Sequence, residues 1–298
     1  MAYWLFRAAA AVLPYLHESI GYPLFSWLGL LAYRLSPAKR SLVSRNMRHV
    51  LGPGASEADV QRATREAFGN LARNYYDLFH LSGLSKQQLR ARMDMGGLEN
   101  LDVALEAGKG VLLTSPHFGN TEYLMQVPTL YPYMHIMLLV ERMADARIFD
   151  LLRDMRAGMG MDIAGVDEPL KVIRRLRENG VVGIAFDRDV TNSGIDTEFF
   201  GQPAVFPVGV VRLAMRTGAR IVPAYGWRDG RSGEFHVRVR PALDLVQTGD
   251  ADSDVQTNLR LMLEVFEPII GERPGEWMAF HELWKHAPAA VPAAHVSR

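Results

Sequence analysis

The sequence predicts an α/β protein in which helices cover both faces of a largely parallel central sheet. Two observations lead to this prediction. From about residue 110 onward, short apolar runs of strand length alternate with longer stretches whose apolar residues recur at helical spacing. Parallel strands of one sheet need crossover connections, which are usually helices, so this alternation is typical of an α/β/α sandwich.

Each apolar run of this region predicts one strand, and the longer stretches predict the covering helices. We expect strands over 110–115, 135–140, 181–186, 220–225 and 234–240. We expect helices near 120–130, 144–159, 168–179, 208–217 and 252–271.

Two further helices are expected before the first strand. Residues 56–82 begin with a capping pattern at Ser56 and Asp59, and their apolar residues then recur at helical spacing. Residues 98–107 predict a shorter helix that ends at Gly108. No long linker divides this part of the chain, so we expect one domain over residues 51–286.

The first 50 residues differ from the rest in charge and hydropathy. They contain the apolar, aromatic runs AYWLFRAAAAVLPYL and IGYPLFSWLGLLAY and are basic, with Glu18 as the one acid. Neither run reaches the roughly 20 apolar residues that a spanning helix needs. Apolar helices beside a basic stretch are typical of a segment that lies on an anionic membrane surface. The alternative is that these helices pack on the domain and keep their arginines in water.

Composition excludes several classes of protein. The chain has 298 residues, of which 48% are apolar and 22% charged, as is ordinary for globular proteins. Its formal net charge of zero argues against a protein that mainly coats nucleic acid. The absence of cysteine excludes disulfides, thiolate zinc sites and cysteine nucleophiles. The tail, 287–298, is rich in Ala and Pro and is expected to be disordered.

The stretch GVLLTSPHFGNTEYLM, residues 110–125, places ionisable side chains where the first expected strand ends. Ligands of open α/β sheets bind beyond the carboxyl ends of the strands, and His117 lies there. Glu122 follows at the start of the next expected helix. A loop histidine can meet a carboxylate in the first helical turn, so that Glu122 fixes the tautomer of His117 as a general base. The alternative is a structural histidine beside a glutamate that favours a helix N-terminus.

Two residues between this pair are candidates for substrate contacts. Gly119 lets a substrate approach the backbone closely. Asn120, or Thr121 beside it, can cap the next helix, whose first amides point toward the site. We therefore expect Gly119 and Asn120 to line a substrate-binding site.

Other catalytic and metal-binding motifs are missing or wrongly spaced. The sequence has no G-x-S-x-G elbow, no Walker A motif and no G-x-G-x-x-G. In HELWKH, His281 and His286 are five residues apart, one more than the zincin motif H-E-x-x-H requires. We expect no metal site there, and a packing or lipid-facing role for Trp277, Phe280 and Trp284.

Ordered blocks along about residues 40–286 resemble one family. GKGVLLTSPHFGNTE resembles the H-x4-D/E block of the glycerolipid acyltransferase superfamily. SLVSRNMRHVLG, the stretch that begins GIAFDRDVTNSG, and EWMAFHELWKH resemble early, middle and late blocks of the bacterial lipid A biosynthesis acyltransferase family. This family includes the phosphatidylinositol mannoside acyltransferases.

The resemblance implies acyl transfer from a thioester, acyl-CoA or acyl carrier protein, to a lipid hydroxyl. It implies His117 as general base with Glu122 as its partner, and direct attack of the hydroxyl on the thioester without an acyl-enzyme. Glu198 matches acids that line the site in the mannoside branch, so it competes with Glu122 as the partner; the alternative is a solvated turn residue. No cofactor beyond the acyl co-substrate and no metal are implied.

Charged residues at two other strand ends are expected in the substrate site. Glu141 opens onto the same sheet edge as His117. Arg142 and Arg188 are expected to meet phosphate groups of donor or acceptor; the alternative is a surface ion pair with Glu141 or Asp187. Asp187 belongs to a DRD block that matches the family and is expected to be structural.

Departures from the family pattern indicate the branch. Val140-Glu141-Arg142 stands where lipid A enzymes usually have a Tyr-Arg-Pro-like sequence, which favours the mannoside branch. Phe206-Pro207-Val208-Gly209 lacks the glutamate of the wider superfamily's F-P-E-G phosphate block, so those contacts are not carried over.

We therefore expect a mannosylated phosphatidylinositol as acceptor first, and a lipid A precursor second. We expect peripheral attachment to anionic lipids at the cytoplasmic face of a bacterial inner membrane, and no nucleic-acid partner. The rival hypotheses are a thioesterase or lipid hydrolase, in which the same base activates water, and a non-catalytic lipid-binding protein.

Overall fold

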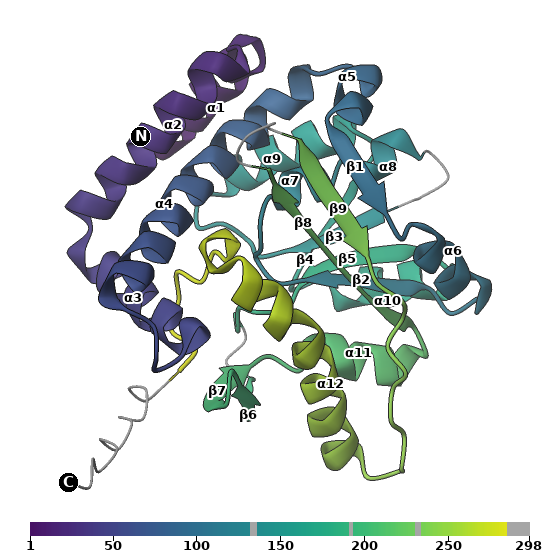
Figure 1. Cartoon of the computed structure of the whole chain (residues 1–298). Helices are drawn as coiled ribbons and strands as arrows, with labels where there is room; N and C mark the ends of the chain where they lie inside the picture. Colours follow the sequence, from purple (N-terminus) through teal and green to yellow (C-terminus); the bar gives the residue numbers. More distant parts are fainter. Residues whose placement is uncertain (132–135, 191–192, 230–233, 285–298) are drawn as a thin grey trace, which may run out of the picture.

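A seven-stranded sheet with the strand order β1-β9-β8-β2-β5-β3-β4 forms the centre of the molecule (Figure 1). The computed structural model describes residues 1–131, 136–190, 193–229 and 234–284. The strands are β1 (Met93–Gly96), β2 (Val111–Ser115), β3 (Ile136–Val140), β4 (Asp162–Gly165), β5 (Val181–Ala185), β6 (Ile195–Phe199), β7 (Gln202–Phe206), β8 (Arg220–Arg228) and β9 (Phe235–Val239).

Helices precede the sheet and connect its strands. They are α1 (Ala2–Val12), α2 (Glu18–Leu35), α3 (Pro37–Leu51), α4 (Glu57–His80), α5 (Lys86–Ala91), α6 (Glu99–Glu106), α7 (Thr121–Leu124), α8 (Val127–Leu130), α9 (Ala146–Gly158), α10 (Pro169–Arg177), α11 (Gly209–Thr217) and α12 (Ala251–Glu272). Short 3-10 turns are η1 (Leu13–Tyr15), η2 (Leu81–Gly83) and η3 (Pro274–Glu276).

The predicted α/β class with a mostly parallel sheet is confirmed. Neighbouring strands of the large sheet run parallel except for β8 and β9, which pair antiparallel. Successive side chains of a strand point to opposite faces, so Leu112 and Val182 pack with α10, α11 and α12. Val111 and Val181 pack on the other face with α5, α6, α7 and α8. Helices therefore cover both faces of the sheet.

Several element predictions were wrong in detail. The helix expected near 120–130 is two short helices, α7 and α8. Strands β1 and β4 were not predicted, nor was the separate antiparallel hairpin of β6 and β7. The tail expected over 287–298 lies outside the described residues.

The first 50 residues form α1, α2 and most of α3, which lie along α4 (Figure 1). Gly21 and Gly29 let α2 approach α4 closely, because an added Cβ would meet the Tyr76 ring at 2.3 Å or the Phe68 carbonyl oxygen at 2.6 Å. Among the helices of the described residues, none has the length and apolar character needed to cross a membrane.

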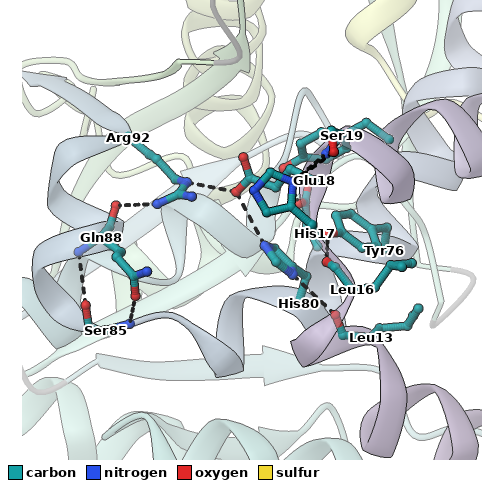
Figure 2. A network of polar contacts seen from close by, with 12 residues as sticks. Leu13, Leu16, His17, Glu18, Ser19, Tyr76, His80, Ser85, Gln88 and Arg92 are labelled. Atoms are coloured by element: carbon teal, nitrogen blue, oxygen red, sulfur yellow. Dashed lines mark hydrogen bonds and ion pairs between the residues drawn. The ribbon is translucent and has the colours of Figure 1, made fainter.

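The start of α2 is also held by a polar network, which Figure 2 shows. The Glu18 carboxylate accepts a hydrogen bond of 2.8 Å from Arg92 and lies 3.4 Å from His80 Nε2. His80 lies against the Leu13 carbonyl, at 3.2 Å. A hydrogen bond from His80 and the charge of Arg92 lower the pKa of Glu18 to about 2, against the opposing effect of burial.

Candidate active site

His117 follows β2 directly and is paired with Asp187, which follows β5. The two strands are neighbours, and Ser115 of β2 lies opposite Ala185 of β5, so the residues two positions further on meet. Nδ1 of His117 lies 2.6 Å from Oδ1 of Asp187. This contact assigns the proton to Nδ1 and leaves Nε2 of His117 as the acceptor for a substrate proton.

The Asp187 carboxylate is fully enclosed by donors. Its Oδ2 accepts hydrogen bonds of 3.0 Å from the His117 backbone amide and from the Trp277 indole. The Asp187 side chain is 1% exposed, whereas the His117 side chain is 43% exposed. A substrate can therefore reach the histidine, while water is kept from its partner.

Charge and burial set the protonation of this pair. The Asp187 carboxylate raises the pKa of His117, although burial of the ring opposes the shift. For Asp187, burial favours the neutral acid, but the charge of and hydrogen bond from His117 prevail and lower its pKa to about 2. The carboxylate thus stays ionised and stabilises a protonated His117.

The C-terminal block EWMAFHELWKH holds the loop that carries His117. The Met278 amide donates to the His117 carbonyl at 2.7 Å, and the Gly119 amide donates to the Glu276 carbonyl at 2.7 Å. His281 Nε2 lies 2.6 Å from the backbone carbonyl of Asp187. The expected packing role of this block is confirmed for Trp277 and Trp284, which are buried in the main apolar cluster.

A metal site does not form in the described part of this block. Among the described residues, no group of three or more His, Asp or Glu side chains is arranged to hold a metal ion. His286 lies outside the described residues.

Glu122 does not pair with His117, which corrects the prediction. Its Oε1 forms an ion pair of 2.8 Å with Arg156 of α9, and both side chains are largely buried. Burial raises the pKa of Glu122, while Arg156 opposes the shift. Glu122 still borders the same cavity as His117, so it belongs to the wall of the site rather than to the histidine pair.

Glu198 lies on β6, in the hairpin that packs against α12. Its carboxylate is 3.9 Å from Arg260 and its side chain is 63% exposed. Glu198 is not among the described residues that line the cavities bordered by His117. The prediction that it shares the role of His117's partner was therefore wrong.

Gly119 and Asn120 determine the conformation of the loop after His117, and Gly119 also borders a cavity. Gly119 has a φ of 60°, and an added Cβ would lie 1.7 Å from the Gly226 carbonyl oxygen, so only glycine fits. Gly119 borders a small cavity of about 160 Å³ beside His117. Asn120 is buried and caps α7, as predicted, by accepting from the Glu122 amide at 2.9 Å. A direct substrate contact is not expected from a buried cap.

Of the charged residues predicted at the other strand ends, two line a cavity beside His117 and one does not. Arg188 and Glu141 form an ion pair of 2.9 Å, and both line the larger cavity next to His117. Arg142 turns instead to Asp167, at 2.8 Å, and is not among the described residues that line that cavity.

The larger cavity has a volume of about 370 Å³ and is mainly apolar. Its floor is the face of the sheet formed by β2, β5 and β3, where Leu113, Gly183 and Leu138 lie side by side. Leu124 and Met125 line it from the α7 side. His117 and the Arg188–Glu141 pair stand at its polar end, beyond the carboxyl ends of the strands.

A second buried charge stabilises the loop from the side of α4. Asp77 is 0% exposed and accepts a hydrogen bond of 2.7 Å from the Tyr22 hydroxyl. It also accepts from the Asn120 amide and pairs with Arg228. Burial disfavours the charged form of Arg228, but Asp77 more than offsets this and raises its pKa.

Removing this carboxylate is expected to be costly. Asp77→Ala should lower the free energy of unfolding at pH 7 by about 3–5 kcal/mol, because Arg228 would remain buried without its partner. Chemical denaturation measures the loss. Asp154→Ala is the matched control: its ion pair with Arg153 is exposed, so a change within about 0.5 kcal/mol is expected. Equal losses in the two variants would contradict this account.

Comparison with known proteins assigns the chain to a family. A family model described as bacterial lipid A biosynthesis acyltransferase matches residues 1–286. A phosphatidylinositol mannoside acyltransferase of Mycobacterium tuberculosis (strain ATCC 25618 / H37Rv) is 30% identical over 249 residues, which cover 80% of this chain and 75% of the relative.

Two further relatives agree with this match. The phosphatidylinositol mannoside acyltransferase of Mycolicibacterium smegmatis is 27% identical, over 80% of this chain and 78% of the relative. A lipid A biosynthesis myristoyltransferase of Escherichia coli is 22% identical, over 95% of this chain and 86% of the relative. The chain therefore belongs to the bacterial lipid A biosynthesis acyltransferase family and is an acyltransferase.

Proposed function

We propose that the protein moves a long acyl chain from a thioester, acyl-CoA or acyl carrier protein, to a hydroxyl of a glycolipid. The observation that carries this proposal is the reachable, Asp187-bound His117 at the polar end of an apolar cavity. The mycobacterial relatives make a mannosylated phosphatidylinositol the first acceptor to test.

His117 acts as the general base in this proposal. Its Nε2 takes the proton from the acceptor hydroxyl, and the oxygen attacks the thioester carbonyl. The new C–O bond forms, the C–S bond breaks, and the proton on His117 passes to the leaving thiolate. Asp187 keeps the ring oriented and stabilises its charge while the proton is held. No acyl-enzyme is needed.

The larger cavity suits the acyl chain. An apolar cavity of about 150 Å³ can bind benzene, so about 370 Å³ has room for on the order of a dozen carbon atoms. The thioester carbonyl would then lie at the polar end, beside His117. Arg188 at this end, which pairs with Glu141, is the proposed contact for the phosphates of the donor or acceptor.

The direct experiment is product analysis with the purified full chain. Palmitoyl-CoA and a mannosylated phosphatidylinositol in vesicles should give acylated glycolipid, detected by mass spectrometry. Free fatty acid without acylated lipid would instead support the thioesterase hypothesis. A lipid A precursor is the second acceptor to include, because the Escherichia coli relative matches nearly the whole chain.

Gly183 is expected to control how long a chain the cavity accepts. Gly183 lines the larger cavity, and a glycine inside a strand often marks close approach of a ligand. Gly183→Leu should therefore lower kcat/KM for palmitoyl-CoA by about 10-fold or more, and much less for a short-chain donor such as butyryl-CoA. An equal loss for both donors would contradict a chain-binding role for this face of the sheet.

The exposed face of the N-terminal helices is the proposed membrane-binding surface. Trp4 and Leu5 of α1 and Ile20, Leu24 and Trp27 of α2 are exposed although they are large and apolar. The next helix, α3, contributes basic side chains: Arg40, Arg45 and Arg48 line a surface cavity. Apolar and basic side chains together favour peripheral attachment to anionic lipid, which we place at the cytoplasmic face of the inner membrane.

Vesicle sedimentation tests this surface. Replacing both Trp4 and Trp27 by serine is expected to weaken binding to phosphatidylglycerol-containing vesicles by about 10-fold or more, because two aromatic side chains lose their burial in lipid. The matched control is Val103→Ser on α6, which is also exposed but lies outside the N-terminal helices and should leave binding unchanged. Unchanged binding of the double tryptophan variant would contradict the assignment.

A further inference from the structure

Asp77 brings together three parts of the chain that are far apart in sequence. Tyr22 donates to it from α2, Asn120 from the loop before α7, and Arg228 from β8. A carboxylate this deeply buried is stable only while its donors stay in place. The position of any one of these donors therefore depends on the other two.

Asn120 connects Asp77 to the loop that carries His117. Its amide nitrogen is bound to Asp77, and its amide oxygen holds the Glu122 backbone amide at 2.9 Å. One helical turn earlier on α4, Asn74 donates to the Gly119 carbonyl at 2.7 Å. Helix α4 thus fixes the segment from Gly119 to Glu122, two residues beyond His117.

Helix α2 is the part of this arrangement that faces outward. Its inner face carries Tyr22 and the two glycines that press against α4, and its start is held by the Glu18 network in Figure 2. Its outer face carries exposed Ile20, Leu24 and Trp27. Tyr22 is the hydrogen-bonding contact from this helix to Asp77, and it lies in the first turns of α2.

We propose that Tyr22 and Asp77 are positioning residues that link the packing of α2 against α4 to the conformation of the His117 loop. This inference rests on the proposed acyl transfer for its kinetic consequence. When α2 packs against α4, the Tyr22 hydroxyl donates to the Asp77 carboxylate, and Asp77 binds the Asn120 amide. The loop then keeps His117 aligned with Asp187. Loss of the Tyr22 hydroxyl frees one oxygen of Asp77 and loosens the loop without removing any group that touches substrate.

The test compares two tyrosines of α2 that make similar contacts with α4. Tyr22 donates to Asp77 at 2.7 Å, and Tyr33 donates to Gln61 at 2.7 Å, at the end of α2 away from the His117 loop. Tyr22→Phe is expected to lower kcat for palmitoyl transfer to mannosylated phosphatidylinositol about 3- to 10-fold with little change in KM. Tyr33→Phe is expected to keep the wild-type kcat.

Hydrogen exchange supplies a readout that does not depend on activity. Backbone amides of residues 117–122 should exchange faster in Tyr22→Phe and at the wild-type rate in Tyr33→Phe. Wild-type exchange and kcat in Tyr22→Phe, or equal effects of the two variants, would overturn the coupling. If the wild-type chain transfers no acyl group, the proposed function fails, while the exchange comparison still decides whether α2 and the loop are coupled.

Discussion

His117→Ala is expected to lower kcat for acyl transfer by about 10²–10⁴-fold, because the acceptor hydroxyl loses its proton acceptor. His117 is held by a buried carboxylate and is open to the apolar cavity. The loss should appear in kcat rather than in KM, since the imidazole contributes to the transition state more than to binding of the chain. Initial rates of acylated glycolipid formation measure it.

Folding of this variant can be checked independently of activity. His117→Ala leaves the buried Asp187 carboxylate without its charged partner, so the unfolding midpoint should fall, and chemical denaturation at the assay temperature shows whether the variant stays folded. His236→Ala is a matched control, because His236 also pairs with an aspartate, Asp94 of the edge strand β1, and neither is among the described residues that line the cavities bordered by His117. Near-wild-type turnover in His117→Ala would exclude the proposed mechanism.

Asp187→Asn is expected to produce the second large effect, a fall in kcat of about 10²–10⁴-fold. An asparagine can turn its NH2 group, which is a donor, toward the protonated Nδ1. It also carries no charge to stabilise the protonated ring. The change keeps the size of the side chain, and the amide oxygen can still accept the hydrogen bond from the Trp277 indole. Transfer rates at saturating donor and acceptor report this loss.

Glu122→Gln is the informative comparison for Asp187→Asn. Glu122 is bound to Arg156 rather than to His117, so its neutralisation should reduce kcat less than that of Asp187. A larger loss in Glu122→Gln than in Asp187→Asn would favour the spacing-based prediction over the observed pairing.

The sequence was informative about the buried parallel strands. Runs such as residues 111–113 and 181–185 are continuously apolar because both faces of the central strands are covered. The edge strands β1 and β4 have four residues each, and β6 and β7 expose one side, so their apolar signal is short or diluted by polar residues. The split of the 120–130 helix coincides with Pro128, which stands in the first turn of α8 and which the apolar spacing alone does not take into account.

The site was only half predictable. The position of His117 after a buried strand followed from the general location of ligand sites in α/β sheets. Its partner did not follow from spacing, because Asp187 is 70 residues away and the contact depends on β5 lying beside β2. The available signal was that Asp187 also lies just beyond the end of a buried strand. Glu122 was predicted instead from its place in the first helical turn and from the H-x4-D/E pattern.

The pH dependence of kcat/KM is the most direct test of the account, because it reports the proton on His117 itself. The base must be neutral to act, so the rate should fall as the pH decreases through the pKa of His117, which Asp187 raises. With the charge removed in Asp187→Asn, this pKa falls, and the acidic limb of the profile is predicted to move to lower pH even as the maximal rate drops. An acidic limb that stays in place in Asp187→Asn, or that persists unchanged in His117→Ala, would contradict the assignment of this pair as the base of acyl transfer.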